Sequence, residues 1–176
     1  TSVFIEAQGT RDAVEAFITD VLATLPPLAH VLDRTDTSLP VTEGKGFSIA
    51  ASISNPGERT LIPPDVATCD ECLADMADPG NRRYQYPFTT CTNCGPRLSI
   101  IEDLPYDRPN TTMRIFPMCP ACETEYTTPT DRRFHAQPIS CPNCGPQLSM
   151  SIAAARALID AGRILAVKGI GGFHLM

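Results

Sequence analysis

Eight cysteines, grouped as four CxxC pairs, are the residues of this sequence best suited to chemistry. The first four and the last four each follow the pattern C-x2-C-x18-C-x2-C, and the second set repeats the first 50 residues later. Two facing CxxC turns supply the four thiolates of a tetrahedral zinc site. We therefore predict two zinc ions, both structural, because four sulfurs leave no open coordination position. The predicted ligands are Cys69, Cys72, Cys91, Cys94, Cys119, Cys122, Cys141 and Cys144.

The duplication extends beyond the cysteines. In the two repeats TCDEC aligns with MCPAC, NRRYQYPFTTC with DRRFHAQPISC, and CTNCGPRLSI with CPNCGPQLSM. Two pairings of the CxxC turns remain open. Each repeat closes on itself, or the outer pairs share one ion and the inner pairs the other, as in the zinc module of DnaJ-type chaperones. Identical spacing within both repeats favours the first. A disulfide framework or a redox CxxC suits the fourfold pattern less well.

The segment between the cysteines explains why a metal is needed. Residues 69–150 hold 11 of the 17 prolines, and their apolar side chains are scattered. Proline at that density interrupts helices and strands, so little core can form. Structural zinc contributes on the order of 10 kcal/mol per site to folding in small domains. Each second pair runs into Gly-Pro (Gly95-Pro96 and Gly145-Pro146), where glycine allows a tight turn whose amide N–H groups face the sulfurs.

The charge of this region argues against nucleic acid as a partner. Residues 69–150 contain seven Arg, no Lys and ten Asp or Glu, and the whole chain has a net charge of −6. Two arginine pairs, Arg82-Arg83 and Arg132-Arg133, occupy equivalent places in the repeats. They are either solvated and locally salt-bridged, or they donate hydrogen bonds that offset thiolate charge. His135 is not needed as a ligand, because four cysteines already serve each site.

The residues before the repeats alternate between strand and helix patterns. We expect strands at Val3–Ala7, Ala29–Leu32 and Phe47–Ala51, and a helix from Thr10 that ends before Pro26-Pro27. The order β-α-β-β resembles the later part of a split βαβ, ferredoxin-like domain. A complete domain would have a further β-α unit in front, so we expect Thr1 to be a truncation point.

After the repeats the composition changes again. Ser151 is expected to cap a helix that ends at Gly162, and Ile164–Val167 reads as a buried strand. A glycine-rich turn, KGIGGFHLM, follows; it matches neither a P-loop nor G-x-G-x-x-G. No apolar run has the length of a membrane span, which excludes an integral membrane protein. Zinc-spaced cysteines indicate the reducing cytoplasm.

The predicted fold class is α+β, with a loop-rich double zinc-finger module in the middle of the chain. The expected divisions are a partial ferredoxin-like domain (1–54), a linker (55–67), zinc finger 1 (68–100), a connector (101–117), zinc finger 2 (118–150) and the start of a third domain (151–176).

These motifs together resemble HypF-type carbamoyltransferases of nickel–iron hydrogenase maturation. The most specific are CDECLADMADPGNRRYQYPFTTCTNCGPR and KGIGGFHL. The resemblance implies an acylphosphatase-like first domain, the eight cysteines as zinc ligands, and a YrdC-like third domain. It also implies that carbamoyl phosphate and ATP are used to carbamoylate the C-terminal cysteine of a partner, HypE, from which the cyanide ligands of the hydrogenase iron are made.

The resemblance carries over to this chain only where its residues match. Lys168, Gly169, Gly171 and Gly172 match the beginning of the YrdC-like nucleotide site. The acylphosphatase-like catalytic Arg and Asn have no counterpart here, so no catalytic residue is assigned, and we expect a zinc-binding fragment without activity of its own. The alternative function is a free-standing zinc module that docks other proteins, as DnaJ-type zinc regions do.

Overall fold

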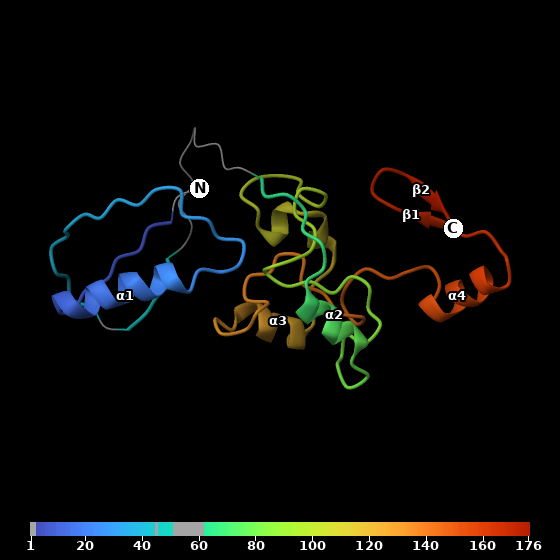
Figure 1. Cartoon of the computed structure of the whole chain (residues 1–176), viewed down its shortest axis with the longest axis horizontal. Helices are drawn as coiled ribbons and strands as arrows, with labels where there is room; N and C mark the ends of the chain where they lie inside the picture. Colours follow the sequence, from blue (N-terminus) through green and yellow to red (C-terminus); the bar gives the residue numbers. More distant parts are fainter. Residues whose placement is uncertain (1–2, 45, 51–61) are drawn as a thin grey trace. The chain divides into compact units, whose positions relative to one another are not determined.

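The computed structural model describes residues 3–44, 46–50 and 62–176, and these form helices, a small sheet and long loops (Figure 1). The chain divides into two compact units, Thr1–Leu61 and Ile62–Met176. The first contains helix α1 (Arg11–Ala23). The second contains helices α2 (Asp70–Ala77), α3 (Pro120–Thr127) and α4 (Ile152–Asp160), the 3-10 turns η1 (Arg108–Asn110) and η2 (Thr112–Ile115), and strands β1 (Ala166–Lys168) and β2 (Phe173–Leu175).

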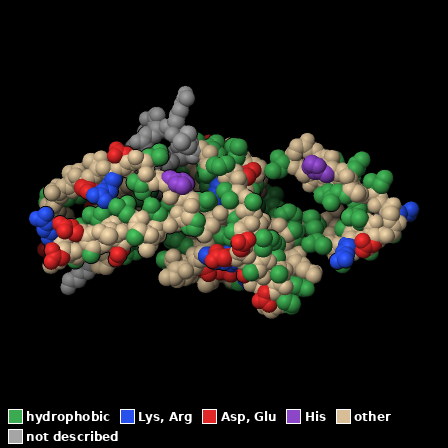
Figure 2. Space-filling model, in the orientation of Figure 1, with side chains coloured by type: hydrophobic (Ala, Val, Ile, Leu, Met, Phe, Trp, Pro, Cys, Tyr) green, Lys and Arg blue, Asp and Glu red, His purple; other side chains and the backbone are tan. Residues whose placement is uncertain are grey.

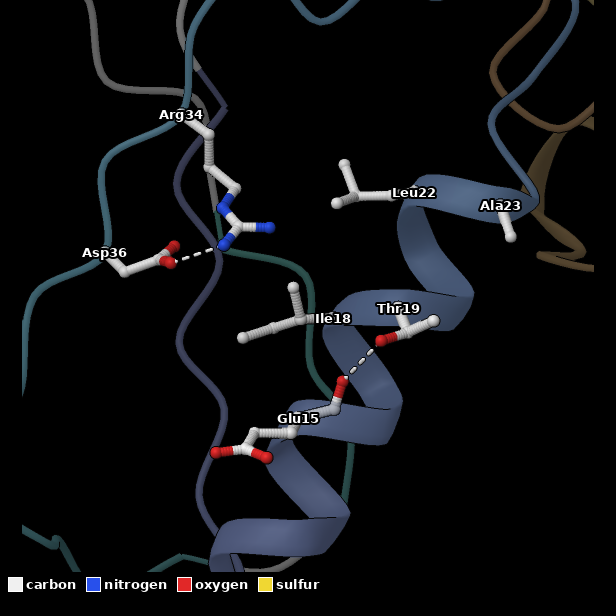
Figure 3. Close-up of a pocket in the computed structure, with 7 residues that line it drawn as sticks. All are labelled: Glu15, Ile18, Thr19, Leu22, Ala23, Arg34 and Asp36. Carbon is white, nitrogen blue, oxygen red and sulfur yellow. Dashed lines mark hydrogen bonds and ion pairs between the residues drawn. The ribbon is translucent and has the colours of Figure 1, made fainter.

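Helix α1 confirms the helix predicted from the sequence. Thr10 caps its start by accepting a hydrogen bond from the Ala13 amide (3.4 Å). The face of α1 that carries Ile18 and Leu22 points across an open hollow toward Arg34 (Figure 3). On the far side of this hollow, Arg34 forms an ion pair with Asp36 at 2.7 Å. None of the described side chains in this unit is buried, and several large apolar ones lie at its surface (Figure 2).

The three strands expected in the first unit are not formed by its described residues. Residues 3–7 and 29–32 are strand-free, as are 47–50, while Ala51 lies outside the described residues. A strand needs a neighbour to satisfy its backbone groups, and the extended segments here do not pair as a ladder. A side chain instead links residue 8 to residue 42: Gln8 accepts from the Thr42 amide (3.2 Å) and donates to the Thr42 carbonyl (3.1 Å).

The two repeats fold alike. Helices α2 and α3 start one residue after Cys69 and Cys119 and lie 50 residues apart in sequence. Each is followed by a turn with a residue in the left-handed region, Gln85 (φ 54°) and His135 (φ 53°). The amides of these two residues donate back to the helices, to the carbonyls of Met76 (2.9 Å) and Tyr126 (3.0 Å). The turn between the knuckles of each repeat is thus anchored on its own helix.

The interior of the second unit is built largely from the cysteines themselves. One buried cluster consists of Cys72, Cys91 and Cys94, and the other of Cys122, Ala136, Ile139 and Cys141. This agrees with the expectation that the repeats have too few apolar side chains for an ordinary core.

The C-terminal elements agree with the sequence in part. Ser151 caps α4 by accepting from the Ala154 amide (3.1 Å), and Gly162 (φ 71°) follows the helix, as expected. The prediction of a buried strand at Ile164–Val167 is wrong. Strand β1 begins at Ala166, pairs antiparallel with β2 in a two-stranded hairpin, and is exposed along its length. A lone hairpin has no second layer to cover it, so its apolar residues stay accessible.

The glycines after the second CxxC pairs serve close packing more than sulfur contacts. The Gly95 amide donates to the Val66 carbonyl and the Gly145 amide to the Cys141 carbonyl, so neither glycine amide reaches a sulfur. The Asn93 amide, in the same turn as Gly95, does donate to the Cys91 Sγ at 3.4 Å, as the sequence predicted for the amides of this turn. A Cβ at Gly145 would lie 2.2 Å from the Tyr86 hydroxyl and 2.4 Å from the Ser140 Cβ. These two repeats meet too closely there for any side chain.

Replacing Gly145 by Ala should therefore destabilise the zinc-loaded chain by about 1–3 kcal/mol, the usual cost of overpacking a tight site. Urea unfolding in excess zinc measures the loss. The control is Gly171→Ala, because a Cβ there meets nothing within 4 Å. Equal stability of the two variants would contradict this account of the Gly145 contact.

Candidate metal centres

The structure brings the four cysteines of each repeat together. In finger 1 the Sγ atoms of Cys69, Cys72, Cys91 and Cys94 all lie within 4.8 Å of one another. Cys69 and Cys72 come from the start of α2, and the other two come from the turn that precedes Gly95. Neighbouring sulfurs are 3.7 Å (Cys69–Cys91), 3.8 Å (Cys91–Cys94) and 3.7 Å (Cys94–Cys72) apart.

Finger 2 repeats this arrangement. Its Sγ atoms also lie within 4.8 Å of one another, with neighbouring distances of 3.7 Å (Cys119–Cys141), 3.7 Å (Cys141–Cys144) and 3.6 Å (Cys144–Cys122). Of the two pairings that the sequence left open, the geometry has the self-contained one, in which each repeat supplies one complete cluster.

These distances fit zinc and exclude disulfides. A zinc–sulfur bond of about 2.3 Å places the corners of a regular tetrahedron about 3.8 Å apart, close to the separations in both clusters. A disulfide would bring two sulfurs to about 2.05 Å, and all eight cysteines are free. The two four-cysteine clusters therefore fit two structural zinc sites, in which the protein's thiolates occupy every tetrahedral position.

Crowding makes the protonation of the sulfurs uneven. In finger 1, the hydrogen bond between Cys72 and Cys91, with burial, raises the pKa of Cys72, and the same bond lowers the pKa of Cys91 to about 4. Burial also raises the pKa of Cys94. In finger 2, burial raises the pKa of Cys141 and takes that of Cys122 to about 12. At neutral pH each cluster thus holds at least two protons that a metal ion must displace.

The arginine pair of finger 1 reaches the cluster of finger 2. The Arg82 Nη2 donates to the Cys122 Sγ at 3.2 Å and to the Glu125 carboxylate at 2.6 Å. Arg83 also binds that carboxylate (2.5 Å), and its Nε donates to the Ser140 carbonyl at 2.9 Å. The Arg83 side chain is only 2% exposed. A buried guanidinium of this kind is stable only with such partners.

The arginine pair of finger 2 makes the equivalent contacts in return. The Arg132 Nη1 donates to the Cys72 Sγ at 3.1 Å, and both Arg132 and Arg133 pair with the Asp75 carboxylate. The Arg133 Nε donates to the Thr90 carbonyl at 3.0 Å. Every acceptor lies 50 residues before its counterpart in finger 2. These reciprocal contacts relate the two fingers by an approximate twofold axis.

Both interpretations of these arginines hold in part, because each pair donates to a cysteine sulfur and is also salt-bridged to a carboxylate of the other finger. The sequence analysis missed that the contact crosses to the other repeat, and it missed the acceptors Asp75 and Glu125. A signal was present: an acidic residue stands three positions after the second cysteine of both repeats. Opposite charges kept at matching places in two repeats are what a reciprocal interface requires.

The acidic partners are held in their charged form. Burial opposes ionisation of Glu125, but hydrogen bonds from Arg83 and Arg82 outweigh it and lower its pKa from 4.5 to about 2. The pKa of Asp75 is lowered by Arg133 and Arg132 against the same opposition. Because the folded pKa lies below the ordinary value, the Glu125 contribution to stability is present above pH 4.5 and is lost as the pH falls toward 2.

A further arginine, Arg108, attaches the connector to finger 2. Arg108 is buried in η1 and donates to the carbonyls of Gln137 (2.7 Å), Ile139 (2.8 Å) and Phe116 (2.7 Å). Nothing in its local sequence singled it out, since its partners are all main-chain carbonyls.

The residues predicted to begin a nucleotide site lie in the C-terminal hairpin. Lys168 ends β1, with its ammonium 5.2 Å from the centre of the Phe173 ring. The Gly169 amide donates to the Gly172 carbonyl at 2.7 Å, which closes a turn that also contains Gly171. The hairpin brings these four residues together; their role in binding a nucleotide stays a prediction.

Among the described residues, no helix has the length and apolar character to cross a membrane.

Comparison with known proteins defines the class first. The HypF finger family model matches residues 68–101 and 118–151, one match for each four-cysteine repeat. The central part of the chain is thus similar to the HypF finger twice over, once in each repeat.

The wider chain resembles HypF-type carbamoyltransferases over nearly its whole length, as its motifs predicted. It is 49% identical to carbamoyltransferase HypF of Rhodobacter capsulatus, over 98% of this chain and 25% of that protein. It is 46% identical to the probable carbamoyltransferase HypF of Methanocaldococcus jannaschii, over 98% of this chain and 24% of the relative. The chain spans about a quarter of the length of these relatives.

Solved structures agree with the sequence relatives. The crystal structure of full-length HypF in the phosphate- and nucleotide-bound form matches with a TM-score of 0.80 and 44% identity, over 95% of this chain and 23% of that one. The structure of T. kodakarensis HypF matches with a TM-score of 0.77 and 45% identity, over 96% of this chain and 22% of that one.

Zinc binding at pH 7 should release at least two protons per ion, because the raised pKa values of Cys72, Cys94, Cys122 and Cys141 keep those thiols protonated. For the same reason zinc affinity should fall as the pH is lowered. Isothermal titration calorimetry in buffers of different ionisation enthalpy counts the protons. A binding heat that does not depend on the buffer would contradict the proposed thiol ligands.

Proposed function

We propose that this chain is part of a carbamoyltransferase of the HypF type, in which its two fingers hold structural zinc. The observation that carries the proposal is the pair of thiolate tetrahedra, each inside a repeat that matches the HypF finger. Identities of 46–49% with carbamoyltransferases support the same activity for the protein to which the chain contributes.

The zinc ions would be held by Cys69, Cys72, Cys91 and Cys94 in finger 1, and by Cys119, Cys122, Cys141 and Cys144 in finger 2. Zinc supplies folding free energy here and no reaction chemistry, because all four positions are filled by thiolates. The sparse apolar core around each cluster supports this role. The eight free thiols support the cytoplasm as the compartment, since zinc must find them reduced.

The reaction we propose for the whole protein uses ATP and carbamoyl phosphate to carbamoylate the C-terminal cysteine of HypE, the step toward the hydrogenase cyanide ligands. Within this chain, Lys168, Gly169, Gly171 and Gly172 would contribute to the nucleotide site. A lysine beside a glycine turn is suited to phosphate, because the ammonium supplies charge and glycine allows close approach.

We further propose the domain organisation that this function requires. Residues 1–54 would belong to an acylphosphatase-like domain, 55–67 to a linker, 68–100 and 118–150 to the fingers, 101–117 to their connector, and 151–176 to the start of a YrdC-like domain. The fingers would act as a rigid spacer between the flanking domains. The acidic charge of residues 69–150 supports a protein partner over a nucleic acid.

The purified chain should contain two zinc ions, and a strong chelator should unfold the repeats, because the metal replaces an apolar core. Elemental analysis gives the stoichiometry, and amide hydrogen exchange of residues 62–150 before and after chelation gives the structural effect. A matched control is the exchange of α4, which contains no cysteine. Unchanged protection in the repeats after zinc removal would refute the structural role.

The proposed activity can be tested by placing this chain in a full-length relative. A chimera of Rhodobacter capsulatus HypF, with the matching quarter replaced by this chain, should carbamoylate the partner's C-terminal cysteine, as followed by the mass of the partner. Replacing Cys72 and Cys122 together by Ser in the chimera should abolish the product, because both zinc sites lose a ligand. A chimera that carries two zinc ions but forms no product would argue against the proposed function.

A further inference from the structure

The crossed arginine pairs link the two metal centres directly. Arg82 of finger 1 donates to the sulfur of Cys122 (3.2 Å), and Arg132 of finger 2 donates to the sulfur of Cys72 (3.1 Å). Each metal centre therefore receives a positive charge from the finger that does not contain it. A four-thiolate zinc centre has a formal charge of −2, and a cation at hydrogen-bonding distance offsets that charge most strongly where water is excluded.

The position of each arginine pair depends on the folding of its own finger. The Arg83 amide is held by the Asn81 side chain (2.9 Å), and the Arg133 amide by the Asp131 side chain (2.8 Å). Both turns are tied back to α2 or α3, and these helices begin at the first ligands, Cys69 and Cys119. A finger that loses its zinc loses the structure that aims its arginines at the other.

Each finger also stabilises the arginines that it receives. Asp75 accepts from both arginines of finger 2, and Glu125 from both arginines of finger 1. The backbone of finger 1 contributes further, since the Thr92 amide donates to the Arg132 carbonyl at 3.2 Å. If one finger unfolded, the buried guanidinium of the other would lose its partners, and an unpaired buried charge is strongly unfavourable.

From this reciprocity we propose that the two zinc sites load as one cooperative unit, coupled through the crossed arginine pairs. Zinc in either finger raises the affinity of the other finger by about tenfold, and the effect is the same in both directions, as linkage requires. The inference rests on the proposed zinc sites and adds that neither behaves independently. Its consequence is that the chain exists mainly with two zinc ions or with none.

Native mass spectrometry during a zinc titration, with a competing chelator as the metal buffer, tests the coupling. Two equal independent sites leave about half of the molecules with one zinc at half-loading, and unequal independent sites leave more. For two sites of equal affinity, tenfold coupling lowers that fraction to about a quarter. A one-zinc fraction equal to or above that calculated for independent sites with the two measured affinities would overturn the proposal.

Variants of the more exposed arginine in each pair show whether each finger acts on the zinc site of the other finger. Arg82→Gln should weaken zinc binding in finger 2 by about tenfold, because Cys122 loses a charged donor. Arg132→Gln should weaken finger 1 in the same way. The site is identified by alkylation during chelation, since the cysteines that lose zinc first react first. Arg82 and Arg132 are preferable to Arg83 and Arg133, because the latter two are more deeply buried.

The matched control is Arg114→Gln, which removes a half-exposed arginine whose one ion-pair partner among the described residues is Glu102, and it should leave both sites unchanged. If each variant weakened its own finger first, the crossed coupling would be refuted while the zinc sites stood. If the unaltered chain bound no zinc at all, the proposed function itself would fail, so the two failures are distinguishable.

Discussion

The convergence of four thiolates on one point is the constraint on which the rest of the second unit depends. Thiolates in a partly buried site repel one another and are costly to desolvate unless a metal ion and nearby cations balance them. The fold meets both needs locally. The start of a short helix and one tight turn set the sulfur positions, and arginines supply the cations. The few buried residues around each cluster pack against sulfur, so the clusters are the centres of the core as well as of the charge.

The duplication explains how so little sequence provides those cations. Among the described contacts, the arginines of a finger donate to the sulfurs of the other finger and not to those of their own. The repeats are not identical, however. Tyr86 donates to the Pro146 carbonyl at 3.0 Å, whereas the equivalent residue in finger 2 is Ala136. Thr92 donates its amide to Arg132, whereas Pro142 at the matching position has no amide to offer. At these two positions, finger 1 therefore donates hydrogen bonds to finger 2 that finger 2 does not donate in return.

The sequence was most informative where spacing alone fixes geometry. The cysteine pattern predicted both clusters, the helical spacing of apolar residues predicted α1, and a capping serine predicted α4, because these features depend on neighbours within a few residues. It was least informative for strands. The alternation at Val3–Ala7 and Ala29–Leu32 and the apolar run at Ile164–Val167 record a tendency to be extended, but a strand exists only with a partner, which lies elsewhere in the chain. The contacts of Arg82 and Arg132 with the other finger could not be predicted from local sequence for the same reason, because they join residues 40 and 60 positions apart.

The approximate twofold relation between the fingers also bears on how such a tandem arises. In a symmetric dimer, the same patch serves on both subunits, and each contact occurs twice. The contacts from Arg82 to Glu125 and from Arg132 to Asp75 have this form. A single finger with the same Arg-Arg turn and helix carboxylate would present both sides of this contact to an identical copy of itself. Linking two such copies in one chain keeps both contacts and allows matching positions to differ, as Tyr86 and Ala136 do.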